Sequence, residues 1–212
     1  MLKGIRIFIA AFLIITNSFS QGFNLLSKGM QVFNLKDDEG RNQATFYSEA
    51  RYENMTGLSN KAWGEVSFNA KDVKSTLVGE ISISVSSIKT GIEKRDEHLQ
   101  SVSWLNSKKY PNVTFKIKDV QRVDLVEDNL VKVVLLGDFT LHGYTKLIYA
   151  NATMKYLEES EITKTILPGD LISVVAKFDI NLSDFGISNS LIGNRVSDKI
   201  QITANLVGSD SK

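Results

Sequence analysis

Strict alternation of apolar and polar side chains is the feature that most constrains how this chain can fold. Between Ile172 and Leu182 every even position is apolar, and four of the five odd positions are polar. Successive side chains of a strand point to opposite faces, whereas a helix would scatter the same residues around its circumference. The segment therefore predicts a strand with one face buried and the other turned to water.

The same alternation recurs along most of the chain. The connection at Leu141–Tyr144 predicts a tight hairpin turn, because Gly143 can adopt a positive φ. Most other connections are also short, so neighbouring strands should be antiparallel. Eight or nine strands are predicted in all, with clear alternation at 65–69, 81–86, 113–118, 148–155 and 200–206 and weaker alternation at 31–35, 45–52 and 130–139.

The number of strands favours a closed sheet. An open sheet of about eight long strands would leave two edges free to pair with other chains, and closure removes them. We therefore predict an all-β fold, an antiparallel lipocalin-like barrel of eight strands. Barrels of this size either fill their interior with side chains or hold one small ligand. A two-sheet sandwich is the alternative, because it would show the same periodicity.

Two connections are longer than a turn. Residues 158–170 are polar and predict a loop at the barrel rim. Residues 93–106 break the alternation, and Leu99, Val102 and Leu105 recur there at helical spacing. The prediction is one short helix between strands.

The N-terminus follows a different pattern. Two basic residues precede a short apolar run at 7–15, and small and polar residues follow up to Ser20. This order is typical of a secretory signal peptide, predicted here as residues 1–20, which leaves 21–212 as a single barrel domain. An uncleaved anchor is the alternative, but the apolar run falls short of the roughly 20 residues that span a bilayer.

Composition limits the classes of function. The chain has 212 residues, of which 42% are hydrophobic, enough to build one sizeable core. It has no cysteine, so it has neither a disulfide nor a thiolate nucleophile. The 25 basic and 24 acidic residues form no basic stripe, and we predict no nucleic-acid partner. Export without disulfides favours the bacterial periplasm or secretion, with no membrane span after signal cleavage.

Residues suited to catalysis are scarce. The chain has two histidines, His98 and His142, and none of the common hydrolase, zinc-protease or nucleotide-binding motifs. A metal centre that combines both histidines with Asp96, Glu97 or Asp138 is one alternative, but the spacing matches no zinc pattern. We predict no enzyme activity, no metal and no cofactor.

The inward apolar side chains are candidates for lining a binding pocket. A packed core is the alternative, because residue types do not distinguish a filled barrel from a hollow one. Small inward residues favour free volume, among them Ala150, Ala176 and Ala204. The predicted lining residues are Phe46, Phe68, Ile81, Ile83, Val85, Phe115, Ile117, Phe139, Ile148, Phe178, Ile180 and Ile202.

A polar cluster is the second candidate site, with Arg95, Asp96, His98, His142 and Asp184 as its members. The Arg95 guanidinium could offer two parallel hydrogen bonds to the phosphate or carboxylate of a ligand head group. The alternative is structural, because charged residues near a helix start commonly cap and anchor the helix.

Five short motifs, in this order along the chain, together resemble one known family. They are Ser87–Gly91, Arg95–Ser101, Lys109–Phe115, Gly137–Thr145 and Asp184–Gly186. Their sequences and order are similar to those of the YceI-like family, lipocalin-like barrels associated with lipid and polyisoprenoid binding. The resemblance spans roughly residues 31–207.

The resemblance implies a barrel that holds a long isoprenoid or fatty chain and performs no catalysis. A hydrocarbon chain gains about 0.8 kcal/mol per buried CH₂ group, so a long tail binds without many polar contacts. Two other hypotheses stay open: a structural or protein-interaction barrel that uses the 158–170 loop, and an enzyme that uses both histidines. A homodimer is a further alternative.

Overall fold

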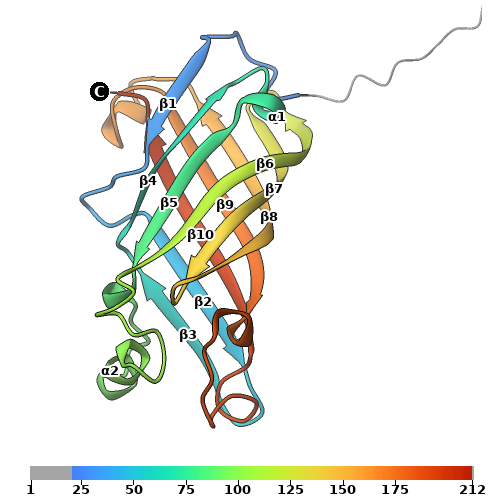
Figure 1. Ribbon diagram of the computed structural model, residues 1–212. Coiled ribbons are helices and arrows are strands. Elements are labelled where there is room, and N and C mark those ends of the chain that lie inside the picture. The colour runs from blue at the N-terminus through green and yellow to red at the C-terminus, as the bar shows by residue number, and fades with distance from the viewer. Residues whose placement is uncertain (1–20, 212) are drawn as a thin grey trace, which may run out of the picture.

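The computed structural model describes residues 21–211, so the predicted signal peptide at 1–20 lies outside the described residues. Ten antiparallel strands form one sheet (Figure 1). No helix within 21–211 is long and apolar enough to cross a membrane. The strands are β1 (Met30–Asn34), β2 (Gln43–Glu49), β3 (Asn54–Ser59), β4 (Ala62–Asn69), β5 (Val78–Ser84), β6 (Asn112–Glu127), β7 (Leu130–Leu141), β8 (Tyr144–Leu157), β9 (Leu171–Asn181) and β10 (Lys199–Ser209).

The sheet closes into an eight-stranded barrel because two positions in its wall are each built from two shorter strands. β1 and β2 follow one another along β10, where Asn34 pairs with Ser209 and Gln43 with Asn205. β4 and β3 form the next position, since β4 pairs with β1 and β3 with β2. The ring then runs from β5 through β9 back to β10. The predicted antiparallel barrel is confirmed, and the sandwich alternative is wrong.

One asparagine side chain fills the break between β1 and β2. Asn42 is buried, and its amide nitrogen donates hydrogen bonds to the carbonyl oxygens of Leu35 and, at 3.0 Å, Val207. Its Oδ1 accepts a hydrogen bond from Val207 N at 2.7 Å. The Asn42 amide thus acts as a piece of strand backbone, and the ladder along β10 continues across the break.

The strand that sequence patterning missed is β3. Its inward positions are Met55, Gly57 and Ser59, so only one of the three carries a large apolar side chain. Gly57 faces the Phe46 ring, and an added Cβ would lie only 2.0 Å from a ring carbon. Phe46 on β2 pairs with Gly57 on β3, so the large side chain of the pair is on β2. This is why the apolar alternation is missing from β3.

The predicted helix exists but is shorter than its spacing suggested. Helix α2 covers Glu93–Gln100 and ends where the N–H and hydroxyl of Ser101 both donate to His98 O, at 3.0 and 2.7 Å. Val102 and Leu105 therefore lie in a turn, Val102 with 79% of its surface exposed, and their assignment to the helix is wrong, whereas Leu99 is on it. A second short helix, α1 (Val73–Thr76), begins after β4 and adds to the single helix predicted.

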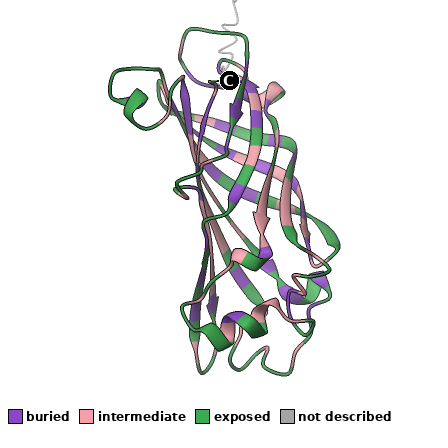
Figure 2. Cartoon of the chain, turned by 90° about the vertical axis from the view of Figure 1, so that its left-hand side faces the viewer, coloured by how far each residue is buried: buried purple, intermediate pink, exposed green. Residues whose placement is uncertain are grey.

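Aromatic side chains fill the end of the barrel that carries α1 and the C-terminus. Phe33 and Phe68 stack with ring centroids 5.2 Å apart, and the Tyr156 ring meets Phe33 edge-on at 5.8 Å. Phe23, from the segment before β1, packs against Phe68 and Tyr156. These four rings, which we call the aromatic plug, close this end. Buried and exposed bands alternate along the strands, as the period-2 pattern requires (Figure 2).

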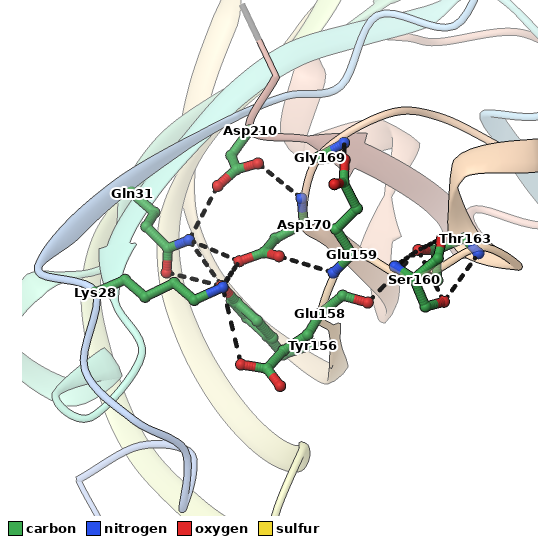
Figure 3. Close-up of polar contacts among 10 residues, drawn as sticks. All are labelled: Lys28, Gln31, Tyr156, Glu158, Glu159, Ser160, Thr163, Gly169, Asp170 and Asp210. Carbon is green, nitrogen blue, oxygen red and sulfur yellow. Dashed lines mark hydrogen bonds and ion pairs between the residues drawn. The ribbon is translucent and has the colours of Figure 1, made fainter.

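A buried polar network lies beside the aromatic plug (Figure 3). The Asp170 carboxylate accepts hydrogen bonds from Lys28 Nζ at 2.5 Å, Tyr156 Oη at 2.5 Å and Glu159 N at 2.8 Å. Burial alone would raise the pKa of Asp170, but these donors outweigh it and hold the pKa below its usual range. Burial raises the pKa of Tyr156, so its hydroxyl stays a donor. The 158–170 loop is thereby fixed to this end.

We expect Asn42→Ala to destabilise the barrel. The substitution leaves one N–H and two carbonyl groups without their partner, at a cost of about 1–3 kcal/mol for each group that stays dry. Urea unfolding followed by circular dichroism measures the loss. Asn151→Ala is the control, because Asn151 is exposed on β8. Equal midpoints for the two variants would contradict the role of Asn42.

Asp170→Asn should destabilise the protein in a pH-dependent way. Because the folded pKa of Asp170 is lowered, its stabilisation is complete above the ordinary aspartate pKa and is lost as the pH falls through the folded value. The unfolding free energy of the variant should be about 3 kcal/mol lower than that of the wild type at pH 7. This difference should narrow below about pH 4.

Unfolding free energies across this pH range measure the effect. Asp179→Asn is the matched control, because Asp179 forms an exposed ion pair with Lys199 on the outer wall. A gap that stays constant with pH would show that the charge of Asp170 does not contribute.

Candidate functional site

An apolar cavity occupies the half of the barrel below the aromatic plug. Its volume is about 600 Å³, within the range of pockets that bind small ligands. Inward side chains of most wall strands line it, and small residues at Ala150, Ala176 and Ala204 keep it open. Nine of the predicted residues lie on this lining: Phe46, Ile81, Ile83, Phe115, Ile117, Phe139, Phe178, Ile180 and Ile202. Their role as ligand contacts stays a prediction.

Three predicted lining residues lie elsewhere. Phe68 belongs to the aromatic plug and is fully buried. Val85 begins a 3-10 turn, Val85–Ser87, directly after β5, so it is not part of the strand that forms the wall. Ile148 packs against the core group that contains Phe139 and Phe185 but does not itself line the cavity. The alternation located these residues on inward faces but did not show how far along the barrel each one sits.

The cavity opens at the end that carries α2. Three segments contribute to this mouth: the β2–β3 connection with Glu53, residues 88–105 around α2, and the 186–198 loop with Arg195. Figure 1 shows α2 and the 186–198 loop together at the end opposite the C-terminus. Sequence reasoning found Arg95 and His98 at the mouth but missed Glu53 and Arg195, which lie in connections without periodicity.

An ion-pair triad spans the mouth. Glu53 Oε1 lies 2.8 Å from Arg95 Nη1, and Glu53 Oε2 lies 2.9 Å from Arg195 Nη2. Hydrogen bonds from Arg195 and the charges of both arginines lower the pKa of Glu53. Each carboxylate oxygen therefore serves a different guanidinium, and the three segments of the mouth meet at one side chain.

Asp96 has a structural role beneath the triad. It is the only buried residue of α2, and its Oδ1 accepts hydrogen bonds from Thr90 N at 2.7 Å and Thr90 Oγ1 at 2.6 Å. Arg95 in turn donates to Thr90 Oγ1 at 2.8 Å and Thr90 O at 3.1 Å. Asp96 thus fixes Thr90, and Thr90 orients the Arg95 guanidinium toward the mouth.

Two members of the predicted polar cluster, His142 and Asp184, lie away from the mouth. His142 forms the β7–β8 hairpin turn with Gly143, and its Nδ1 lies 3.1 Å from Phe185 O. Asp184 is exposed and accepts from Asn181 Nδ2 at 3.2 Å. Neither is among the described residues that line the cavity, whereas His98 is. Within 21–211 no three His, Cys, Asp or Glu side chains converge as a metal site.

A known protein family has a sequence model that matches this chain. The model of the YceI-like domain matches residues 36–208, most of the chain. The chain belongs to the YceI-like family. A UPF0312 protein of Vibrio cholerae is 31% identical over 48% of this chain and 50% of its own length. Protein YceI of Escherichia coli is 33% identical over 43% of this chain and 44% of its own length. The chain spans about half the length of the curated relatives it matches.

Solved structures share the YceI-like fold. Burkholderia cenocepacia BcnA superposes with a TM-score of 0.63 at 17% identity, covering 81% of this chain and 99% of BcnA. The Campylobacter jejuni YceI protein gives 0.61 at 22% identity, covering 77% and 90%. A polyisoprenoid-binding domain from Saccharophagus degradans gives 0.60 at 15% identity, covering 86% and 100%. At these identities the likeness shows the fold alone.

Asp96→Ala should loosen the mouth of this YceI-like barrel. Removing the carboxylate leaves Thr90 N without its partner and should lower the unfolding free energy by about 1–3 kcal/mol. Hydrogen exchange should rise at residues 88–96 and stay unchanged at the aromatic plug. Glu97→Ala, an exposed change on the same helix, is the control. Matching exchange profiles for the two variants would contradict the anchoring role.

Proposed function

We propose that this protein is an exported carrier that holds one long apolar lipid, a polyisoprenoid or a fatty chain, inside the barrel. The observation that carries the proposal is the apolar cavity of about 600 Å³, open at one end and closed by the aromatic plug at the other. The likeness to a polyisoprenoid-binding domain supports the choice of ligand class. A bacterial periplasmic or secreted location fits the signal-like N-terminus and the bacterial relatives.

The chemistry of the lining supports binding rather than reaction. Aliphatic and phenylalanine side chains make up most of the wall, so a hydrocarbon chain would gain about 0.8 kcal/mol for each CH₂ it buries there. The charged groups gather at the mouth, where one end of an elongated ligand would stay. This arrangement favours a carrier over the histidine-based enzyme, because His142 lies away from the cavity that His98 lines.

Lipid extraction of protein purified from its own host tests the proposal directly. Native mass spectrometry should show an adduct that disappears after organic extraction, and the extract should contain a long-chain lipid. Repeated absence of any adduct, together with no uptake of added lipid by the extracted protein, would instead favour the structural or protein-interaction alternative.

Two neighbouring positions on β10 offer a matched pair of variants. Ala204 lines the cavity, and Asn205 is exposed on the outer face of the same strand. Ala204→Phe should place a ring in the cavity and lower the affinity for a long-chain lipid at least about tenfold, since it displaces several CH₂ groups from the wall. Asn205→Phe should leave the affinity unchanged. Equal affinities for both variants would place the ligand outside the barrel.

A further inference from the structure

The mouth of the cavity carries an excess of positive charge. Among the described residues of the lining, Lys94, Arg95 and Arg195 are cationic, and Glu53 is the single carboxylate. All four lie at the rim, and the wall below them is mostly apolar. An apolar tube with a cationic rim is complementary to a molecule with a hydrocarbon tail and an anionic end.

Glu53 shows what kind of group the rim can bind. Its two oxygens pair with two different arginines, at 2.8 Å from Arg95 Nη1 and 2.9 Å from Arg195 Nη2. The Nε of Arg195 adds a third contact at 3.2 Å. Guanidinium groups match the planar geometry of a carboxylate and form strong charge-assisted hydrogen bonds with it. The space between the arginines is therefore shaped to hold one carboxylate.

One of the two arginines is positioned independently of Glu53. Thr90 Oγ1 and O accept hydrogen bonds from Arg95, and buried Asp96 fixes Thr90. Arg195 differs, because its side chain is 60% exposed and its described hydrogen bonds go to Glu53. Loss of the Glu53 carboxylate would leave Arg95 in place and free Arg195 to turn toward another anion.

We infer that the mouth recognises the carboxylate head group of a long-chain fatty acid, which replaces Glu53 between Arg95 and Arg195. The inference rests on the proposed function, because it assumes that the tail lies in the cavity, and it narrows that function to one class of ligand. Glu53 then acts as an internal competitor that holds the two arginines in the empty protein. A ligand with a neutral head group would leave the triad undisturbed.

Three probes of equal chain length test the inference: palmitate, hexadecanol and methyl palmitate. Isothermal titration calorimetry with lipid-free protein should give palmitate at least about tenfold higher affinity than the two neutral probes. Glu53→Gln keeps the size of the side chain but removes its charge. It should strengthen palmitate binding severalfold and leave hexadecanol binding unchanged.

The arginine variant provides the opposite change. Arg195→Gln should abolish the preference for palmitate over hexadecanol while the affinity for hexadecanol stays the same. Arg122→Gln is the control, because Arg122 pairs with Asp124 on β6, and neither residue lines the cavity. Thermal unfolding of each variant checks that the barrel is intact.

The outcomes separate this inference from the proposed function. Equal affinities of wild type for all three probes would overturn the head-group inference and leave the apolar carrier standing. A palmitate preference that Arg195→Gln and Glu53→Gln do not change would also overturn it, because the triad would then only hold the three segments of the mouth together. Failure of all three probes to bind would count against the carrier itself.

Discussion

The hydrogen-bonded ring of the barrel depends on one side-chain amide at the point where its backbone is interrupted. Asn42 pairs with Val207 and Leu35 across the break between β1 and β2. An unpaired row of buried N–H and C=O groups there would cost several kcal/mol and would open an edge in the wall. Because the ring is complete, the inward faces of all eight wall positions enclose one interior, and the rest of the molecule is organised around it.

The two ends of that interior are treated in opposite ways. At one end, stacked rings and the network around Asp170 exclude water and fasten the segment before β1, the 158–170 loop and the last strand together. Toward the other end, small residues in the middle of the strands leave space, and charged groups on three connections face one another at the mouth. Packing therefore defines one end and electrostatics the other, with the apolar cavity between them.

Much of this fold was predictable, because alternation is a direct consequence of strand geometry. The inward residues of β9 and β10, such as Phe178 and Ile202, were identified from periodicity alone. β3 was not, because Gly57 yields its space to the ring of Phe46 and so leaves no apolar signal. The role of Asn42 could not be predicted either, because it depends on hydrogen bonds with Val207, which is 165 positions away in the sequence.

The candidate site was predictable in its apolar part and not in its polar part. Arg95 drew attention because it belongs to a dense charged motif, whereas Glu53 and Arg195 sit in irregular connections and meet only when the barrel closes. His142 illustrates the reverse error. The sequence grouped it with Arg95 in the polar cluster, but it lies in the β7–β8 hairpin turn, where its Nδ1 contacts Phe185 O, and it does not line the cavity. Long-range pairing of charges leaves no local signal in a sequence.

The aromatic plug also sets a depth. In the proposed carrier, the packed end that contains the plug would act as a floor, and a chain would enter at the α2 end with its tail first. The Phe33–Phe68 stack lies behind the cavity lining, so the packed core in front of it would limit how long a chain fits before it must bend or leave its head group beyond the rim. The same stacked rings that keep water out of the fold would therefore let the proposed carrier discriminate ligands by length.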